Sequence, residues 1–137
     1  MERKLELRDI AGYLPHSLYA QFRHTGQFEY NKPCVIEGVN VLAQTFMDSA
    51  KVWASDIKPI LRPLSDLNKT IVHDGKEIVP IDYLKKIGKP YDILNSKTIQ
   101  NQYQLFDYLH ELKIDYRGLI DAGLAISVYD LDENPYE

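Results

Sequence analysis

The chain is poor in cysteine, with Cys34 as the single example among 137 residues. One thiol cannot form an internal disulfide, which excludes a small secreted domain stapled by disulfides and is typical of a reducing compartment. We interpret Cys34 as a small buried hydrophobic residue rather than a reactive thiol. The charged segment 1–10 lacks the apolar stretch of a secretory signal, so we expect a cytoplasmic location.

Long apolar runs are also missing, because none approaches the roughly 20 residues with which a helix crosses a bilayer. We therefore expect no membrane segment. Basic charge is not in excess either: 16 lysines and arginines stand against 20 aspartates and glutamates, for a net charge of -4. An acidic chain is repelled on average by phosphate backbones, so nucleic acid is a disfavoured partner.

Motifs that carry catalysis or hold a metal are absent. His110 and Glu111 begin like the zinc-protease motif HExxH, but the second histidine would have to stand where the chain has Ile114. The serines lack the flanking glycines of a nucleophile elbow, and neither glycine-rich phosphate-binding pattern occurs. The four histidines share no ligand spacing with one another or with Cys34. The sequence thus predicts no metal, no cofactor and no enzymatic activity.

Size and composition are those of one ordinary globular domain. The hydrophobic fraction is 45% and the charged fraction 26%, and 137 residues suffice to bury a core without staples. We find no repeat and no flexible linker, so we expect a single domain over 1–137. The acidic tail 130–137 ends in a polar segment that we expect to be frayed, or to act as a binding element for a basic partner.

The first half of the chain predicts a short helix followed by an antiparallel meander. Leu7, Ile10, Ala11 and Leu14 lie on one helical face, and Pro15 ends that helix. Turn signals then separate short runs with β propensity. The expected strands are Leu18–Phe22, Phe28–Tyr30, Cys34–Glu37 and Val41–Phe46, with turns at 24–26 and 38–40. Residues 47–56 carry no pattern that decides between helix and strand.

The clearest local pattern predicts a β-hairpin over 70–79. Asp74 and Gly75 suit a two-residue type I′ turn, because glycine accepts a positive φ without steric cost. With that turn Ile71 faces Ile78. Before the hairpin, the segment 58–63 is flanked by prolines and favours an extended strand, and 64–67 forms a single helical turn. After it, Pro80 can open a helix at its first position.

The C-terminal third predicts the longest helix, from Thr98 to Leu112. Its apolar residues recur every three to four positions and should form a buried face: Ile99, Tyr103, Phe106, Leu109 and Leu112. A second short helix is expected over 116–122, and a strand over 124–129. The predicted fold is α+β: a small antiparallel sheet, a meander plus the hairpin 70–79, covered on one face by helices, the main one C-terminal.

Three stretches resemble a family of small uncharacterised proteins that are common in phages and prophages of gut Bacteroides-type bacteria. The stretches are LELRDIAGYLP, KPILRPLSDLNKTIVHDGKEIVPIDYL and GLIDAGLAISV, and they cover roughly a third of the chain. The central one, Lys58 to Leu84, is the most specific. The resemblance implies a phage origin and a bacterial host cytoplasm, and it transfers no catalytic residues.

The leading hypothesis for function is a non-enzymatic module that binds a host or phage protein. Ten tyrosines stand against four phenylalanines, and tyrosine suits half-buried positions and interfaces. The segment Leu18 to Asp56 has the least regular pattern and no counterpart in the resemblance. The candidate partner-binding residues are Tyr19, Phe22, Arg23, Phe28, Tyr30 and Trp53.

Three alternatives stay open. The first is a nucleic-acid-associated phage regulator, with Arg3, Lys4, Arg8 and Arg23 gathered into a patch. The second is a small enzyme whose site the fold assembles from scattered residues such as His16, His73 and Asp74. The third concerns assembly, because an exposed edge strand at Leu18–Phe22 or Val41–Phe46 could pair with a second copy of the chain.

Overall fold

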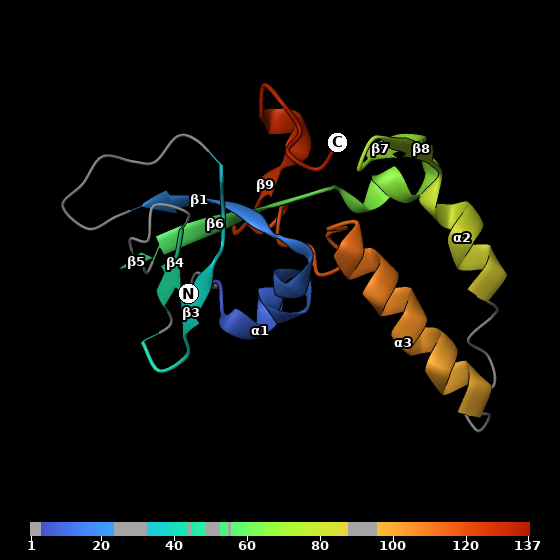
Figure 1. The fold of residues 1–137 in the computed structure, drawn as a ribbon, viewed down its shortest axis with the longest axis horizontal. Helices are drawn as coiled ribbons and strands as arrows, with labels where there is room; N and C mark the ends of the chain where they lie inside the picture. Colours follow the sequence, from blue (N-terminus) through green and yellow to red (C-terminus); the bar gives the residue numbers. More distant parts are fainter. Residues whose placement is uncertain (1–3, 24–32, 44, 49–52, 55, 88–95) are drawn as a thin grey trace.

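The computed structural model describes residues 4–23, 33–43, 45–48, 53–54, 56–87 and 96–137 (Figure 1). Within these ranges short strands and helices alternate, and the prediction of an α+β fold is confirmed. The helical segments are α1 (Leu7–Ile10), η1 (Ala11–His16), η2 (Leu64–Asn68), α2 (Pro80–Ile87), α3 (Ser96–Glu111) and η3 (Val128–Asp130). The strands are β1 (Tyr19–Arg23), β2 (Cys34–Val35), β3 (Gly38–Asn40), β4 (Thr45–Met47), β5 (Trp53–Ala54), β6 (Asp56–Leu61), β7 (Ile71–His73), β8 (Lys76–Ile78) and β9 (Ile126–Ser127).

The central sheet has the strand order β2-β1-β6-β9. β1 is antiparallel to both β2 and β6, whereas β9 pairs with β6 in parallel, with Ile60 opposite Ile126. The segment 58–63 is extended as its flanking prolines predict, and it forms most of β6. Smaller sheets are built from β3-β4-β5 and from the hairpin β7-β8.

In the described part of the chain β1 lies between β2 and β6, and β4 lies between β3 and β5. β2 pairs with Tyr19 and Ala20 of β1. The expected pairing with a second copy through Leu18–Phe22 or Val41–Phe46 stays a prediction.

The two faces of the central sheet bury different side chains, because successive residues of a strand point to opposite faces. Ala20 and Phe22 of β1 join Ile57 and Leu61 of β6 in the main core, under α1 and η1. Cys34 is buried in this core, as expected. Ile60 points the other way and packs with Val128 and Tyr136.

The face that the sequence predicts for α3 is buried only at its C-terminal end, where Leu109 and Leu112 are buried as predicted. Tyr103 and Phe106 are 70% and 43% exposed, and the side chain of Ile99 lies outside the described residues. Leu105 and Tyr108 join Leu109 and Leu112 on the side that packs with Ile71 of the hairpin in a second core. The prediction that α3 covers the main sheet is therefore not confirmed, and Figure 1 shows α3 beside α2, away from β1 and β6. The apolar residues of α3 occur on two neighbouring sides of the helix, so the sequence alone does not decide which side is buried. The side that faces the hairpin is the buried one.

The hairpin is as predicted. Ile71 pairs with Ile78, and Asp74 and Gly75 have φ values of 50° and 78°, as a type I′ turn requires. The 3-10 turn η2 and helix α2 also lie where the sequence predicts them.

One turn prediction and one helix prediction are wrong. Residues 38–40, expected as a turn, form β3, and the turn comes at 41–43, inside the expected strand Val41–Phe46. The expected helix over 116–122 is a series of turns, in which the Asp115 carboxylate accepts the backbone N–H groups of Leu119 and Ile120, both at 2.9 Å. A side chain that satisfies backbone donors in this way competes with a regular helix.

The strand expected over 124–129 is confined to β9. Of the expected meander, Phe28–Tyr30 and the turn at 24–26 lie outside the described residues.

The tail 130–137 is not frayed as expected, because Tyr136 fixes it to the central sheet. The buried Tyr136 hydroxyl donates to the Ile60 carbonyl at 2.7 Å and accepts the Tyr19 N–H at 3.0 Å. Desolvation by burial raises the pKa of Tyr136 above its ordinary value, which keeps the hydroxyl protonated and able to donate. The sequence does not predict these contacts of Tyr136, because the residues around it in the tail are acidic and suggest exposure to solvent.

No helix in the described part of the chain is long and apolar enough to cross a membrane.

Replacing Leu112 with alanine should lower the free energy of unfolding by about 2–5 kcal/mol, because a fully buried leucine leaves a cavity. Tyr103→Ala should cost less than about 0.5 kcal/mol, since that side chain is mostly exposed. Urea unfolding of both variants measures the difference. Equal losses would mean that α3 buries the face that contains Tyr103.

Replacing Tyr136 with phenylalanine should lower the free energy of unfolding by about 1–3 kcal/mol, because a buried carbonyl and a buried N–H lose their partner. Tyr103→Phe makes the same change on an exposed ring and serves as the control. If the two variants unfold at the same urea concentration, the tail is not held through this hydroxyl.

Candidate functional site

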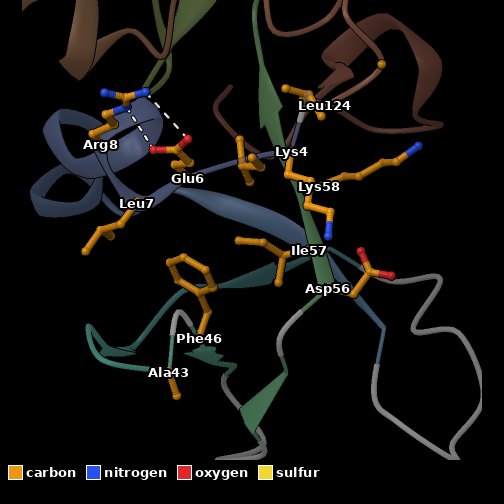
Figure 2. A pocket seen from close by; sticks show the side chains of 12 residues that line it. Lys4, Glu6, Leu7, Arg8, Ala43, Phe46, Asp56, Ile57, Lys58 and Leu124 are labelled. Atoms are coloured by element: carbon orange, nitrogen blue, oxygen red, sulfur yellow. Dashed lines mark hydrogen bonds and ion pairs between the residues drawn. The ribbon is translucent and has the colours of Figure 1, made fainter. Parts of the chain in front are cut away.

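A broad groove of about 1030 Å³ opens between the N-terminal segment, the β3–β4 turn and β6 (Figure 2). Apolar side chains form its floor: Leu5, Leu7, Phe46, Ile57 and Leu124. Charged side chains of both signs stand around it: Lys4, Glu6, Arg8, Asp56 and Lys58. An apolar centre inside a charged rim is the usual anatomy of a protein–protein interface.

The wall of the groove at the β3–β4 turn carries the most exposed apolar side chain described. Leu42 is 99% exposed and lies beside Ala43, which lines the groove. Val41, next to it, is also exposed. Tight turns normally carry polar residues or glycine, so two exposed aliphatic residues at a turn have no evident use in folding. Their position is explained if a partner covers them.

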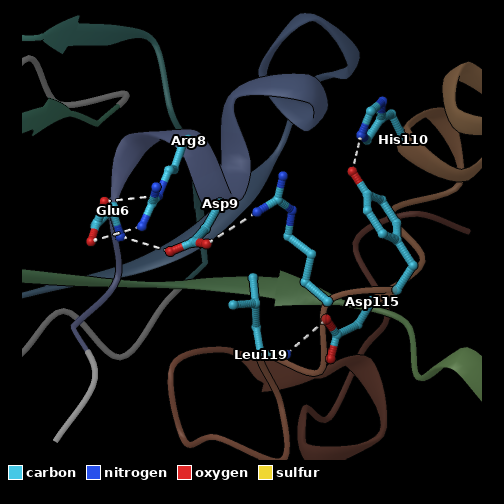
Figure 3. Close-up of polar contacts among 8 residues, drawn as sticks. Glu6, Arg8, Asp9, His110, Asp115 and Leu119 are labelled. Carbon is cyan, nitrogen blue, oxygen red and sulfur yellow. Dashed lines mark hydrogen bonds and ion pairs between the residues drawn. The ribbon is translucent and has the colours of Figure 1, made fainter.

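Ion pairs and a hydrogen bond to the backbone connect residues of the opposite wall of the groove (Figure 3). Arg8 pairs with Glu6 at 2.9 Å. The buried Asp9 accepts the Glu6 N–H at 2.9 Å and lies 3.4 Å from Arg117, which follows Asp115 in the turns after α3. These contacts join α1 to the segment that brings Leu124 to the groove, so the site has a preformed wall.

The residues predicted to bind a partner do not form one surface. Trp53 is 48% exposed in β5, on the sheet that carries the exposed turn. Phe22 is almost fully buried in the main core, and Tyr19 is half-buried on the other face of the central sheet, with its ring against Tyr136. Arg23 ends β1, and Phe28 and Tyr30 lie outside the described residues.

Sequence reasoning named Lys4 and Arg8 as members of a basic patch, but it did not predict the groove that they line. Leu42 was assigned to a strand, where an apolar residue needs no explanation. Its one distinguishing signal is the asparagine before it, since Asn40 Oδ1 accepts the Ala43 N–H at 3.2 Å and thereby closes the turn.

A second, smaller pocket of about 340 Å³ lies across the central sheet, and the fold does bring His16, His73 and Asp74 together there. Tyr19, Tyr136, Glu111 and Lys113 complete most of its lining. Behind it lies the guanidinium of Arg62, which is almost fully buried at the end of β6.

Burial and the neighbouring cations act on the charge of His73. The Nη2 of Arg62 donates to the Val72 carbonyl at 2.9 Å and lies 3.5 Å from His73 Nδ1. Because a guanidinium can only donate, this contact favours an Nδ1 that carries no proton, and Nε2 faces Asp74 Oδ2 at 3.5 Å. Desolvation by burial lowers the pKa of His73, and Arg62 and Lys113 lower it further while Asp74 opposes them. His73 is therefore neutral at pH 7.

Metal binding has no evident site in the part of the chain that the structure describes, where no three histidine, cysteine, aspartate or glutamate residues are grouped to hold an ion.

Comparison of the chain with models of protein families, with curated proteins and with solved structures gives no match.

Proposed function

We propose that this chain is a non-enzymatic protein–protein interaction module that acts in a bacterial cytoplasm and is encoded by a phage or prophage. Its partner would be a host or phage protein that covers the groove between α1 and the β3–β4 turn. The observation that carries the proposal is Leu42, an aliphatic side chain almost wholly in solvent at the edge of an apolar groove.

The chemistry of the groove favours a protein over other partners. Burying Leu42 and the apolar floor against a partner would release apolar surface from water, at about 25 cal/mol per Å². The mixed charges of the rim suit a surface with both signs, since Lys4, Arg8 and Lys58 alternate with Glu6 and Asp56 around the groove. Such a rim selects a partner by charge complementarity and contributes less to affinity than the apolar centre does.

The alternative of a nucleic-acid regulator draws less support from the described residues. It relies on Arg8, which is engaged by Glu6, and on Lys4, which lines the same mixed-charge rim. The other two arginines of the expected patch contribute no described side chain. A phosphate backbone would meet carboxylates as well as cations at this groove.

The test compares proteins recovered from host-cell lysate, after chemical crosslinking, by the parent chain and by Leu42→Asp. A true partner should be enriched by the parent and bound at least tenfold more weakly by Leu42→Asp, because a carboxylate would be buried without a partner. Leu64→Asp is the matched control: it places the same charge on a half-exposed leucine of η2, which does not line the groove.

Leu42→Asp should unfold at the urea concentration of the parent, because the Leu42 side chain is 99% exposed. Recovery of the same proteins by the parent and Leu42→Asp would remove the groove as the binding site. Retention on heparin at low salt, lost steeply as salt rises, would favour the nucleic-acid alternative instead.

A further inference from the structure

The smaller pocket is lined by a lysine whose stem is buried and whose ammonium reaches the water in the pocket. Lys113 is 5% exposed, and no protein oxygen lies within hydrogen-bond or ion-pair distance of its Nζ in the described part of the chain. Its Nζ lies 4.7 Å from the centroid of the Tyr136 ring. An ammonium that keeps little of its hydration favours an anionic acceptor, because the loss of hydration is costly.

Lys113 also occupies a backbone position that disfavours lysine. It follows α3 with a φ of 57°, and Ile114 N–H donates to the Leu109 carbonyl at 2.9 Å while Lys113 N–H donates to His110 at 3.1 Å. This pattern is the Schellman motif, whose left-handed position is usually glycine. The chain therefore combines backbone strain with an ammonium that no carboxylate of the described residues pairs with, at one residue. Fold stability alone would be better served by glycine there.

Three residues with left-handed backbone meet at this pocket. Ser17, Asp74 and Lys113 are the non-glycine residues with positive φ among those described, and all three line it. Such strain is concentrated at functional sites in proteins, where the surrounding structure holds side chains in a required position.

The pocket is positive at its floor and negative at its mouth. The Arg62 guanidinium lies behind the buried ring of His73, and Lys113 stands beside Tyr136, so two cations face inward. Asp74 and Glu111, by contrast, are exposed and line the same pocket, where each opposes the lowering of the Lys113 pKa that burial causes. Neither carboxylate approaches Nζ within ion-pair distance.

We propose that this pocket binds a small zwitterionic ligand, whose carboxylate meets Lys113 Nζ at the floor and whose cationic group meets Asp74 and Glu111 at the mouth. The carboxylate supplies the acceptor that Lys113 lacks. A phosphate dianion would meet two carboxylates at the mouth and is disfavoured. The volume of about 340 Å³ admits a molecule the size of a small amino acid. The proposal is independent of the groove and of the protein partner proposed for it.

The test is calorimetric titration with three ω-amino acids of increasing length, glycine, β-alanine and γ-aminobutyrate. Acetate, propionate and butyrate are the matched acids that lack the cationic group, and inorganic phosphate is the anion control. At least one amino acid should bind with a Kd below about 10 mM and at least tenfold more tightly than its matched acid. Phosphate should bind no better than the acids.

Lys113→Met should abolish binding of that amino acid, whereas Lys76→Met, the same change at an exposed lysine of β8, should leave the Kd unchanged. Asp74→Asn keeps the turn, because asparagine accepts a positive φ, and should reduce the affinity of the amino acid towards that of its matched acid. Lys113→Gly relieves the strain as well as removing the charge, so it should melt at or above the temperature of the parent while losing the ligand.

Binding that survives in Lys113→Met or Lys113→Gly would overturn the proposal. So would equal affinities for an amino acid and its matched acid, or no binding of any of the three amino acids at 10 mM, a limit that corresponds to about -2.7 kcal/mol. Since none of these measurements involves the groove, their failure leaves the interaction with a protein partner untouched.

Discussion

A single buried guanidinium joins the three parts of this fold. Arg62 ends β6, and its backbone N–H and carbonyl bind Lys113 and Asp115, at 2.7 and 2.8 Å. Its side chain donates to Val72 of the hairpin and to the Tyr136 carbonyl of the tail. Burial lowers the pKa of Arg62, and the buried carboxylate of Asp66 opposes that shift. The contacts with Val72, His73 and Tyr136 all come from one guanidinium nitrogen, Nη2.

The features predictable from the sequence were those set by neighbouring residues. The Asp74-Gly75 turn and the helical turn η2 depend on local φ preferences, so single residues reveal them. The orientation of α3 depends on the position of the hairpin that packs against it, and the spacing of apolar residues within α3 carries no information about that position. The tail was misjudged for the same reason, since its charges suggest solvent while Tyr136 fills a gap between Tyr19 and Ile60.

The candidate sites were harder to predict because both are assembled from distant segments. The groove combines α1, the β3–β4 turn and the end of a series of turns near Leu124. In the smaller pocket, His16 and His73 were named from the sequence only as scattered residues, and Lys113 was not noticed. Its signal was a lysine placed where a helix usually ends on glycine. A lysine at a position that usually holds glycine is recognised only when the last residue of the helix is known.

The parallel pairing of β6 with β9 has a consequence for how the chain folds. Ile60 and Ile126 are neighbours in the sheet, so the chain leaves the sheet after β6 and returns to it at β9 as one long excursion. That excursion holds the hairpin, α2 and α3, which pack on one another in a core of their own. Ile71 of the hairpin and Leu109 of α3 are 38 residues apart, whereas Ile60 and Ile126 are 66 residues apart, so contacts of the second core close the shorter loop. A second core that formed first would shorten the free loop whose closure entropy opposes the β6–β9 pairing, and mutations that weaken this core would then slow folding.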